Sequence, residues 1–174
     1  MLPTVAKIAS VRPLASLHRV AVKPKTEVTL KHRAMRYLAR REHSRAELHA
    51  KLLPHVQEDD DLEAVLDDLA QRNWLSDERA AEQMVNQRRS RFGAQRIAHE
   101  LRRRGISDDL IDAAMPQLRE SERDAAREVW QKKFGILPQD AKEKARQVRF
   151  LQSRGFSMES IFSLFKPDSA LEDD

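Results

Sequence analysis

Two short stretches with the same pattern decide how this chain folds: Arg104-Gly105-Ile106-Ser107 and, 50 positions later, Arg154-Gly155-Phe156-Ser157. In each, the glycine suits the left-handed conformation just past a helix end, and the apolar residue after it packs back on the last turn. The serine then caps the next helix. Each stretch therefore predicts a tight turn between two helices, and the recurrence predicts an internal repeat.

Apolar positions ahead of these turns recur at a similar spacing. Leu101 matches Leu151, 50 residues later, and Leu52, 49 residues earlier. The first copy has no glycine turn, because Pro54 and the acidic stretch 58–61 occupy that region. We therefore predict three copies, the first with a longer internal loop.

Each copy has the pattern of three helices. In the first copy Ser44-Arg45-Ala46-Glu47 is a capping box that opens a helix. The clearest 3.6-residue periodicity follows at Leu62, Val65, Leu66 and Leu69. No segment shows sustained alternation of apolar and polar residues, so we predict no strands. Three short helices bury too little alone and must stack on neighbouring copies, which predicts an all-α fold of three tandem three-helix repeats in an elongated, curved body.

The predicted division follows the copies and the composition of the two ends. It comprises a basic, disordered arm (1–28), repeat 1 (29–75), repeat 2 (76–118), repeat 3 (119–166) and an acidic tail (167–174). Residues 1–26 carry five basic residues and no acid. That composition also resembles an organelle transit peptide, an interpretation we rank second to a disordered arm.

Composition excludes several classes of function. The chain of 174 residues has no cysteine, which excludes disulfides, thiol nucleophiles and zinc sites with thiolate ligands. Its four glycines stand singly, so it has no glycine-rich phosphate loop. No apolar run approaches the roughly 20 residues that span a bilayer, so we expect a soluble protein.

Catalytic patterns are weak. The histidines, which we expect on the solvated surface, are His18, His32, His43, His49, His55 and His99. The acidic run Asp59-Asp60-Asp61 fits a solvated loop before a helix better than a Mg²⁺ site. We expect no enzyme, and therefore no catalytic residue, metal, cofactor or small-molecule substrate.

Basic residues form the stronger functional signal. Seven arginines fall within 17 residues, opposed only by Glu100: Arg88, Arg89, Arg91, Arg96, Arg102, Arg103 and Arg104. Guanidinium groups bind phosphates and carboxylates bidentately, which favours a binding surface. A weaker patch comprises Lys132 and Lys133 with four residues that we also assign to binding, Lys142, Lys144, Arg146 and Arg149. Of the aromatic residues, Phe92 lies within the arginine cluster, whereas Tyr37, Trp74, Trp130 and Phe162 fit the core.

The chain resembles the RecX family of bacterial regulators of the RecA recombinase. The residues that carry the likeness are the segments 37–48 (YLARREHSRAEL), 69–81 (LAQRNWLSDERAA), 91–93 (RFG), 100–106 (ELRRRGI) and 150–157 (FLQSRGFS). The resemblance implies three tandem three-helix repeats that bind RecA and its filament on single-stranded DNA. It further implies that they limit filament growth, strand exchange and ATP hydrolysis, act in the cytoplasm and have no catalytic site.

Two other functions remain open at this point. Three-helix units can present a helix-turn-helix reader to duplex DNA, so the chain could act as a DNA-binding regulator without RecA. It could also be an adaptor that binds only protein, through its acidic helices. An adaptor of that kind should depend little on the arginine cluster.

Overall fold

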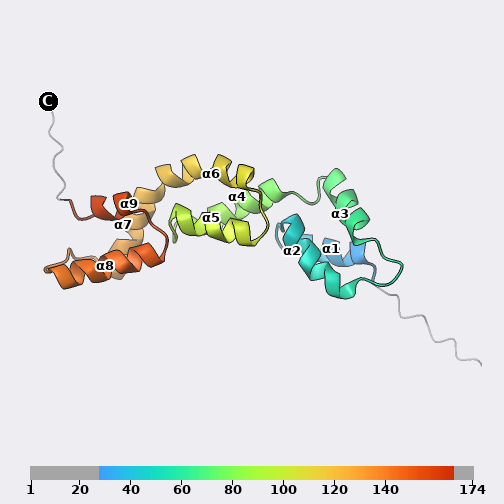
Figure 1. Ribbon diagram of the computed structural model, residues 1–174, viewed down its shortest axis with the longest axis horizontal. Coiled ribbons are helices and arrows are strands. Elements are labelled where there is room, and N and C mark those ends of the chain that lie inside the picture. Colours follow the sequence, from blue (N-terminus) through green and yellow to red (C-terminus); the bar gives the residue numbers. More distant parts are fainter. Residues whose placement is uncertain (1–27, 167–174) are drawn as a thin grey trace, which may run out of the picture.

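The computed structural model describes residues 28–166, and all regular structure in that range is helical, as predicted. The predictions for the basic arm, apart from residue 28, and for the acidic tail lie outside the described residues. The helices form three units that follow one another along the long axis of the molecule (Figure 1). The predicted elongated array of three-helix repeats is confirmed.

Each unit contains three α-helices. Unit 1 comprises α1 (Leu30–Leu38), α2 (Arg45–Leu52), a short 3₁₀ turn η1 (Leu53–His55) and α3 (Leu62–Gln71). Unit 2 comprises α4 (Asp77–Arg88), α5 (Ala94–Arg103) and α6 (Asp108–Glu120). Unit 3 comprises α7 (Glu122–Lys133), α8 (Ala141–Ser153) and α9 (Met158–Ser163). The helix α6 extends two residues beyond the predicted division after residue 118, and Ser121 alone separates it from α7. The exact division between repeats 2 and 3 stays a prediction.

Side chains at the helix starts satisfy the free backbone N–H groups, as the sequence predicts. The capping box of α2 is complete, with Ser44 accepting from the Glu47 N–H and Glu47 accepting from the Ser44 N–H. Ser107 and Ser157 accept from the N–H three residues later, at the starts of α6 and α9. These local bonds explain why the helices begin at these residues.

The two glycine turns have the predicted conformation. Gly105 has a φ of +74° and Gly155 a φ of +80°, both in the left-handed region. The Ile106 N–H donates to the Leu101 carbonyl at 3.2 Å, and the Phe156 N–H donates to the Leu151 carbonyl at 3.3 Å. Both apolar side chains are buried, which closes the end of the preceding helix over the core of its own unit.

Every unit has a hydrophobic core of its own. The central side chains are Leu48, Leu52 and Leu66 in unit 1, Ile97, Leu101 and Ile111 in unit 2, and Leu151 and Ile161 in unit 3. The matched residues Leu52, Leu101 and Leu151 are all fully buried, as their repeat spacing predicts. In the described part of the chain, no buried apolar cluster spans two units.

Three expectations for single residues were wrong. His43 is only 3% exposed: it packs within unit 1, with its ring 6.0 Å from the ring of Tyr37, and does not lie on the solvated surface. Trp74 and Phe162 are 42% and 43% exposed, so neither belongs to a core. Trp130 is buried, as expected, and its indole N–H donates to the Gln147 side chain at 2.7 Å.

Candidate functional site

The units join through polar contacts at two places. At the first joint, the start of α2 meets the Gly105 turn and the start of α4. There the Arg45 N–H donates to the Asp77 carboxylate at 2.7 Å, and the Ser44 hydroxyl donates to the Arg104 carbonyl. A Cβ at Gly105 would overlap the side chain of Ala46, so the turn is also a close approach between units.

The second joint repeats this arrangement between the start of α5, the Gly155 turn and the start of α7. The Gly93 N–H donates to the Arg154 carbonyl at 2.9 Å, and the Ala94 N–H donates to the Glu122 carboxylate at 2.9 Å. A Cβ at Gly93 would overlap the backbone of Gly155. Each joint therefore places a helix start of one unit against a carboxylate and a turn carbonyl of the next.

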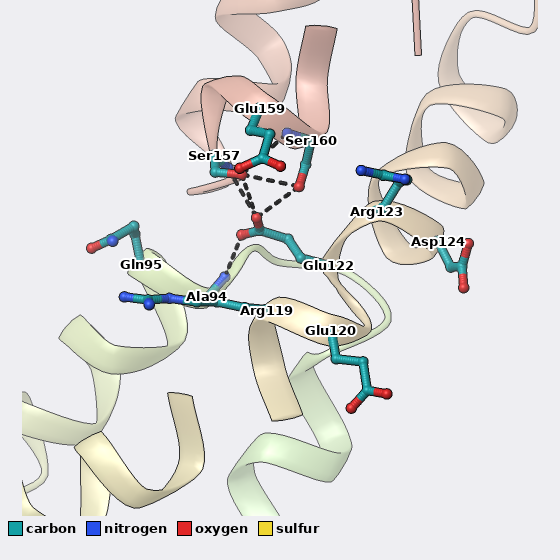
Figure 2. A pocket seen from close by; sticks show the side chains of 10 residues that line it. All are labelled: Ala94, Gln95, Arg119, Glu120, Glu122, Arg123, Asp124, Ser157, Glu159 and Ser160. Carbon is teal, nitrogen blue, oxygen red and sulfur yellow. Dashed lines mark hydrogen bonds between the residues drawn. The ribbon is translucent and has the colours of Figure 1, made fainter. Parts of the chain in front are cut away.

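Glu122 is the most buried carboxylate in the described part of the chain, at 5% exposure. One carboxylate oxygen accepts from Ala94, and the other accepts from the hydroxyls of Ser157 at 2.5 Å and Ser160 at 2.9 Å (Figure 2). These bonds compensate the cost of burying the charge. Glu122 borders a cavity of about 790 Å³ whose other lining residues include both acids and arginines, such as Glu159 and Arg123.

The seven clustered arginines divide into two groups. Four lie near carboxylates: Arg88 and Arg96 face Glu100 at 3.5 and 3.6 Å, Arg102 faces Asp108 at 2.8 Å, and Arg104 faces Glu47 at 3.5 Å. Arg89, Arg91 and Arg103 are exposed and form no ion pair with any described residue. Only this second group has its full charge available to a partner.

Arg96 has a structural role that the sequence did not indicate. Its guanidinium donates to the Ser153 carbonyl at 2.9 Å and stacks on Phe92, with 4.5 Å to the ring centroid. A Cβ at Gly155 would lie 2.5 Å from the Arg96 Cβ. Although Arg96 and Arg103 are seven residues apart on one helix, Arg96 belongs to the second joint and Arg103 to the open surface.

The weaker basic patch also divides. Lys142, Lys144, Arg146 and Arg149 are exposed on α8 and form no ion pair with a described residue. Lys144 lies over Phe162 and Phe165, and Arg146 lies over Phe134. Lys132 and Lys133 instead end α7 and line a groove with Arg88, Arg91 and Arg154. The sequence did not indicate Arg154 as a residue of this groove, because it stands in the motif of the Gly155 turn and outside the basic clusters.

Two titratable groups of unit 1 have perturbed pKa values. Burial lowers the pKa of His43, whose Nδ1 lies 3.0 Å from the Arg41 carbonyl oxygen. Burial disfavours ionised Glu47, but hydrogen bonds from Arg41 and from the Ser44 N–H, with the charge of Arg104, outweigh it and lower its pKa. Of these two groups, Glu47 links the units, through its ion pair with Arg104.

Residues 28–166 contain no group of histidine and acidic side chains that could hold a metal ion, and Asp61 caps α3 by accepting from the Ala64 N–H at 2.9 Å. In the same range, every helix is too short or too polar to cross a membrane.

Comparison with known proteins covers all three units. Family models described as the first, second and third three-helix domains of RecX match residues 31–69, 76–115 and 120–165. The chain is 45% identical to the regulatory protein RecX of Ralstonia nicotianae over 87% of this chain and 95% of that protein. It is 49% identical to the regulatory protein RecX of Leptothrix cholodnii over 78% of this chain and 86% of that protein.

Solved structures agree on the fold. The crystal structure of RecX from Lactobacillus salivarius superposes with a TM-score of 0.62 at 19% identity, covering 78% of this chain and 91% of that chain. A second crystal structure of regulatory protein RecX gives a TM-score of 0.63 at 20% identity, covering 80% of this chain and 72% of that chain. From the three matched domains and these relatives we conclude that the chain belongs to the RecX family.

Proposed function

We propose that this chain regulates the RecA recombinase by binding the RecA–single-stranded DNA filament, where it limits filament growth, ATP hydrolysis and strand exchange. The observation that carries the proposal is the match of all three units, in order, to the three domains of the RecX family. An elongated row of units with exposed cations suits a long groove lined by protein and DNA. Acting there requires the chain to share the bacterial cytoplasm with RecA.

The proposed contact surface consists of cations that lack a carboxylate partner among the described residues. In the arginine cluster these are Arg89, Arg91 and Arg103, and on α8 they are Lys142, Lys144, Arg146 and Arg149. Arg88, Arg96, Arg102 and Arg104 contribute less to binding, because carboxylates of the chain already neutralise part of their charge.

The experiment is a titration of the protein into RecA, ATP and single-stranded DNA while ATP hydrolysis is measured. The double variant Arg89→Glu, Arg103→Glu should stay folded, because both side chains are exposed and outside the joints. It should raise the concentration needed for half-maximal suppression by about tenfold or more, since charge-assisted contacts are worth about 1.5–3 kcal/mol each.

The matched control is Arg36→Glu with Arg40→Glu, two exposed arginines near the end of α1 with the same change in charge. Asp67 and Asp68 are unsuitable, because Asp67 pairs with Arg45 and Asp68 with Lys31 within unit 1. Equal inhibition by the folded Arg89 and Arg103 variant and the wild type would contradict the proposed surface. A sequence-specific duplex footprint without RecA, together with no effect on ATP hydrolysis, would favour a helix-turn-helix regulator instead.

A further inference from the structure

A groove crosses the second joint on the side of the α4–α5 loop and the ends of α7 and α8. Its volume is about 660 Å³, within the range of ligand-binding clefts in proteins. Its lining comes from both units: Arg88, Ser90, Arg91 and Phe92 from unit 2, and Val129, Lys132, Lys133, Phe150 and Arg154 from unit 3. Any molecule bound there touches both units.

The groove is strongly cationic. Five of its nine lining residues are arginine or lysine, and none of the nine is acidic. Arg88 reaches Glu100 only at 3.5 Å, and Lys132 reaches the exposed Glu128 only at 3.3 Å. These two carboxylates offset part of the charge, but Arg91, Lys133 and Arg154 form no ion pair with a described residue. The groove therefore has a positive electrostatic potential, and binding of an anion there would reduce the repulsion between its cations.

The first joint shows that this charge is not a requirement of the fold. At corresponding positions, Arg104 of the first joint faces Glu47, the third residue of α2, at 3.5 Å. In the second joint the third residue of α5 is Arg96, so Arg154 meets another cation in place of an acid. Three guanidiniums share the ring of Phe92, with Arg96 at 4.5 Å, Arg88 at 5.6 Å and Arg154 at 5.8 Å from its centroid.

Aromatic rings hold these cations at the groove. Arg154 also lies over Phe150, with 4.7 Å to the ring centroid, and donates to the Arg91 carbonyl at 3.3 Å. Stacked guanidiniums and rings next to a cationic groove are the combination on which nucleic-acid bases stack while their phosphates are bound. We propose that the groove between units 2 and 3 is a binding site for single-stranded nucleic acid that the chain uses without any partner protein.

In this site the phosphates lie between the cations of the two units, Arg91 on one side and Lys132 and Lys133 on the other. A base stacks on the layer formed by Arg154 and Phe150. An acidic peptide would satisfy the charge but would make no use of the rings. A rigid duplex would present its phosphates to the cations, but its paired bases could not reach the aromatic rings of the groove. The lining therefore favours a single strand over both alternatives.

This inference deepens the proposed function, because a strand held here would be shared between the chain and a RecA filament. Its test contains no RecA, so its failure is distinguishable from failure of the proposed regulation. The full chain is titrated into a fluorescently labelled oligothymidylate, and anisotropy is recorded over a series of salt concentrations.

The decisive variant is Lys132→Gln with Lys133→Gln, which neutralises two exposed cations of the groove. We expect affinity at low salt to fall about tenfold or more. We also expect the slope of log K against log salt to become shallower by about 1.4, since each phosphate contact on a single strand contributes about 0.7.

The matched control is Arg119→Gln with Arg123→Gln. These arginines lie at the same joint and are exposed, but they line the separate cavity that also contains Glu120, Asp124 and Glu159 (Figure 2). We expect the control variant to keep the wild-type slope and affinity. Equal losses in the two variants would mean that binding follows net charge alone, which would overturn the site.

Two further probes test the nature of the ligand. An abasic oligomer with the same phosphates should bind wild-type protein about fivefold more weakly or worse, because stacking of the bases is lost. A duplex of the same length should lose less affinity than the oligothymidylate when Lys132 and Lys133 are neutralised. Equal binding of the abasic oligomer, or equal sensitivity of the duplex, would overturn the assignment to a single strand.

Discussion

The first and second joints bring corresponding residues together but differ in the forces that stabilise them. In both joints, two consecutive residues at the start of a helix donate hydrogen bonds to the next unit. One bond goes to the carbonyl of the residue before a glycine, and the other goes to a carboxylate at the start of that unit. The residues are Ser44, Arg45, Asp77 and Arg104 at the first joint and Gly93, Ala94, Glu122 and Arg154 at the second. The difference lies in what surrounds these bonds.

The first joint relies on partly exposed charge pairs, among them Glu42 with Arg79 at 2.9 Å and Glu47 with Arg104 at 3.5 Å. Both joints have a close approach at a glycine, and the second adds the buried Glu122. There Arg88 and Arg96 share Glu100. Arg91, Lys133 and Arg154 form no ion pair with a described residue. A repeat can thus keep its geometry while the arginine before the glycine pairs with an acid in one copy and stacks on aromatic rings in the next.

The largest expected effect tests close approach at the second joint. Gly155→Ala adds a Cβ that would lie 2.5 Å from the Arg96 Cβ, at a residue whose φ is +80°. We expect a loss of about 3 kcal/mol, from an unfavourable φ of about 1–2 kcal/mol and overpacking of about 1–3 kcal/mol. Denaturant unfolding followed by the fluorescence of the buried Trp130 reports on unit 3.

The control for this prediction is Gly135→Ala. Gly135 has a similar φ of +67°, but its added Cβ would meet nothing closer than the Gln131 carbonyl at 3.3 Å. We expect a loss of about 1 kcal/mol, from the backbone conformation alone. Equal losses at the two glycines would show that contact between the units costs nothing, and the second joint would then be loose.

The next largest effect is the loss of stability when the carboxylate of each joint, Glu122 or Asp77, is replaced by its amide. Glu122→Gln should destabilise by about 2 kcal/mol, because charge-assisted bonds to a buried carboxylate are worth about 1.5–3 kcal/mol. Asp77→Asn should cost about 1 kcal/mol, because Asp77 is only half-buried and accepts a single bond between units, from Arg45. Thermal and denaturant unfolding measure both; a larger loss at Asp77 would reverse the comparison.

A smaller effect should separate the joints by their response to salt. Glu42→Gln removes the charge pair with Arg79 and should cost about 0.5 kcal/mol at low salt. The cost should vanish near 1 M salt, where the Debye length is about 3 Å. The loss caused by Glu122→Gln should persist at high salt because that carboxylate is buried. Parallel salt series of the unfolding free energy would refute the distinction if both losses were screened alike.

The smallest effect concerns pH. Burial lowers the pKa of His43 below its ordinary value of 6.5, so the folded chain binds fewer protons at this site than the unfolded chain. The contribution of neutral His43 to the free energy of unfolding is fully present above pH 6.5. It is lost as the pH falls through the lowered pKa of the folded chain. His43→Asn should flatten the stability–pH curve in this window. An unchanged curve would show that unit 1 tolerates the charged imidazole.

The fold could be predicted because its signals are local. A serine cap, a glycine past a helix end and a buried leucine each depend on residues within a few positions. Ser44, Gly105 and Gly155 therefore adopt the conformations that their neighbours in sequence indicate. For the same reason the repeat was visible from two four-residue turns.

The candidate site could be predicted only in part. The sequence located the basic clusters, but it could not tell which cations meet an acid from another segment. Arg104 and Glu47 are 57 positions apart, and only the joint brings them together. His43 has the sequence context of a surface residue, yet it is buried beside Tyr37, six positions earlier in the chain.

The sequence by itself determined the helices, their caps and the three-unit repeat, because short-range hydrogen bonds and apolar periodicity control these features. Only the tertiary structure decided that the glycine turns are contacts between units and that Arg96 and Arg154 share a ring at a cationic groove. The physical reason is that charge neutralisation and close packing depend on which surfaces meet. Residues about 60 positions apart come into contact only when the units dock.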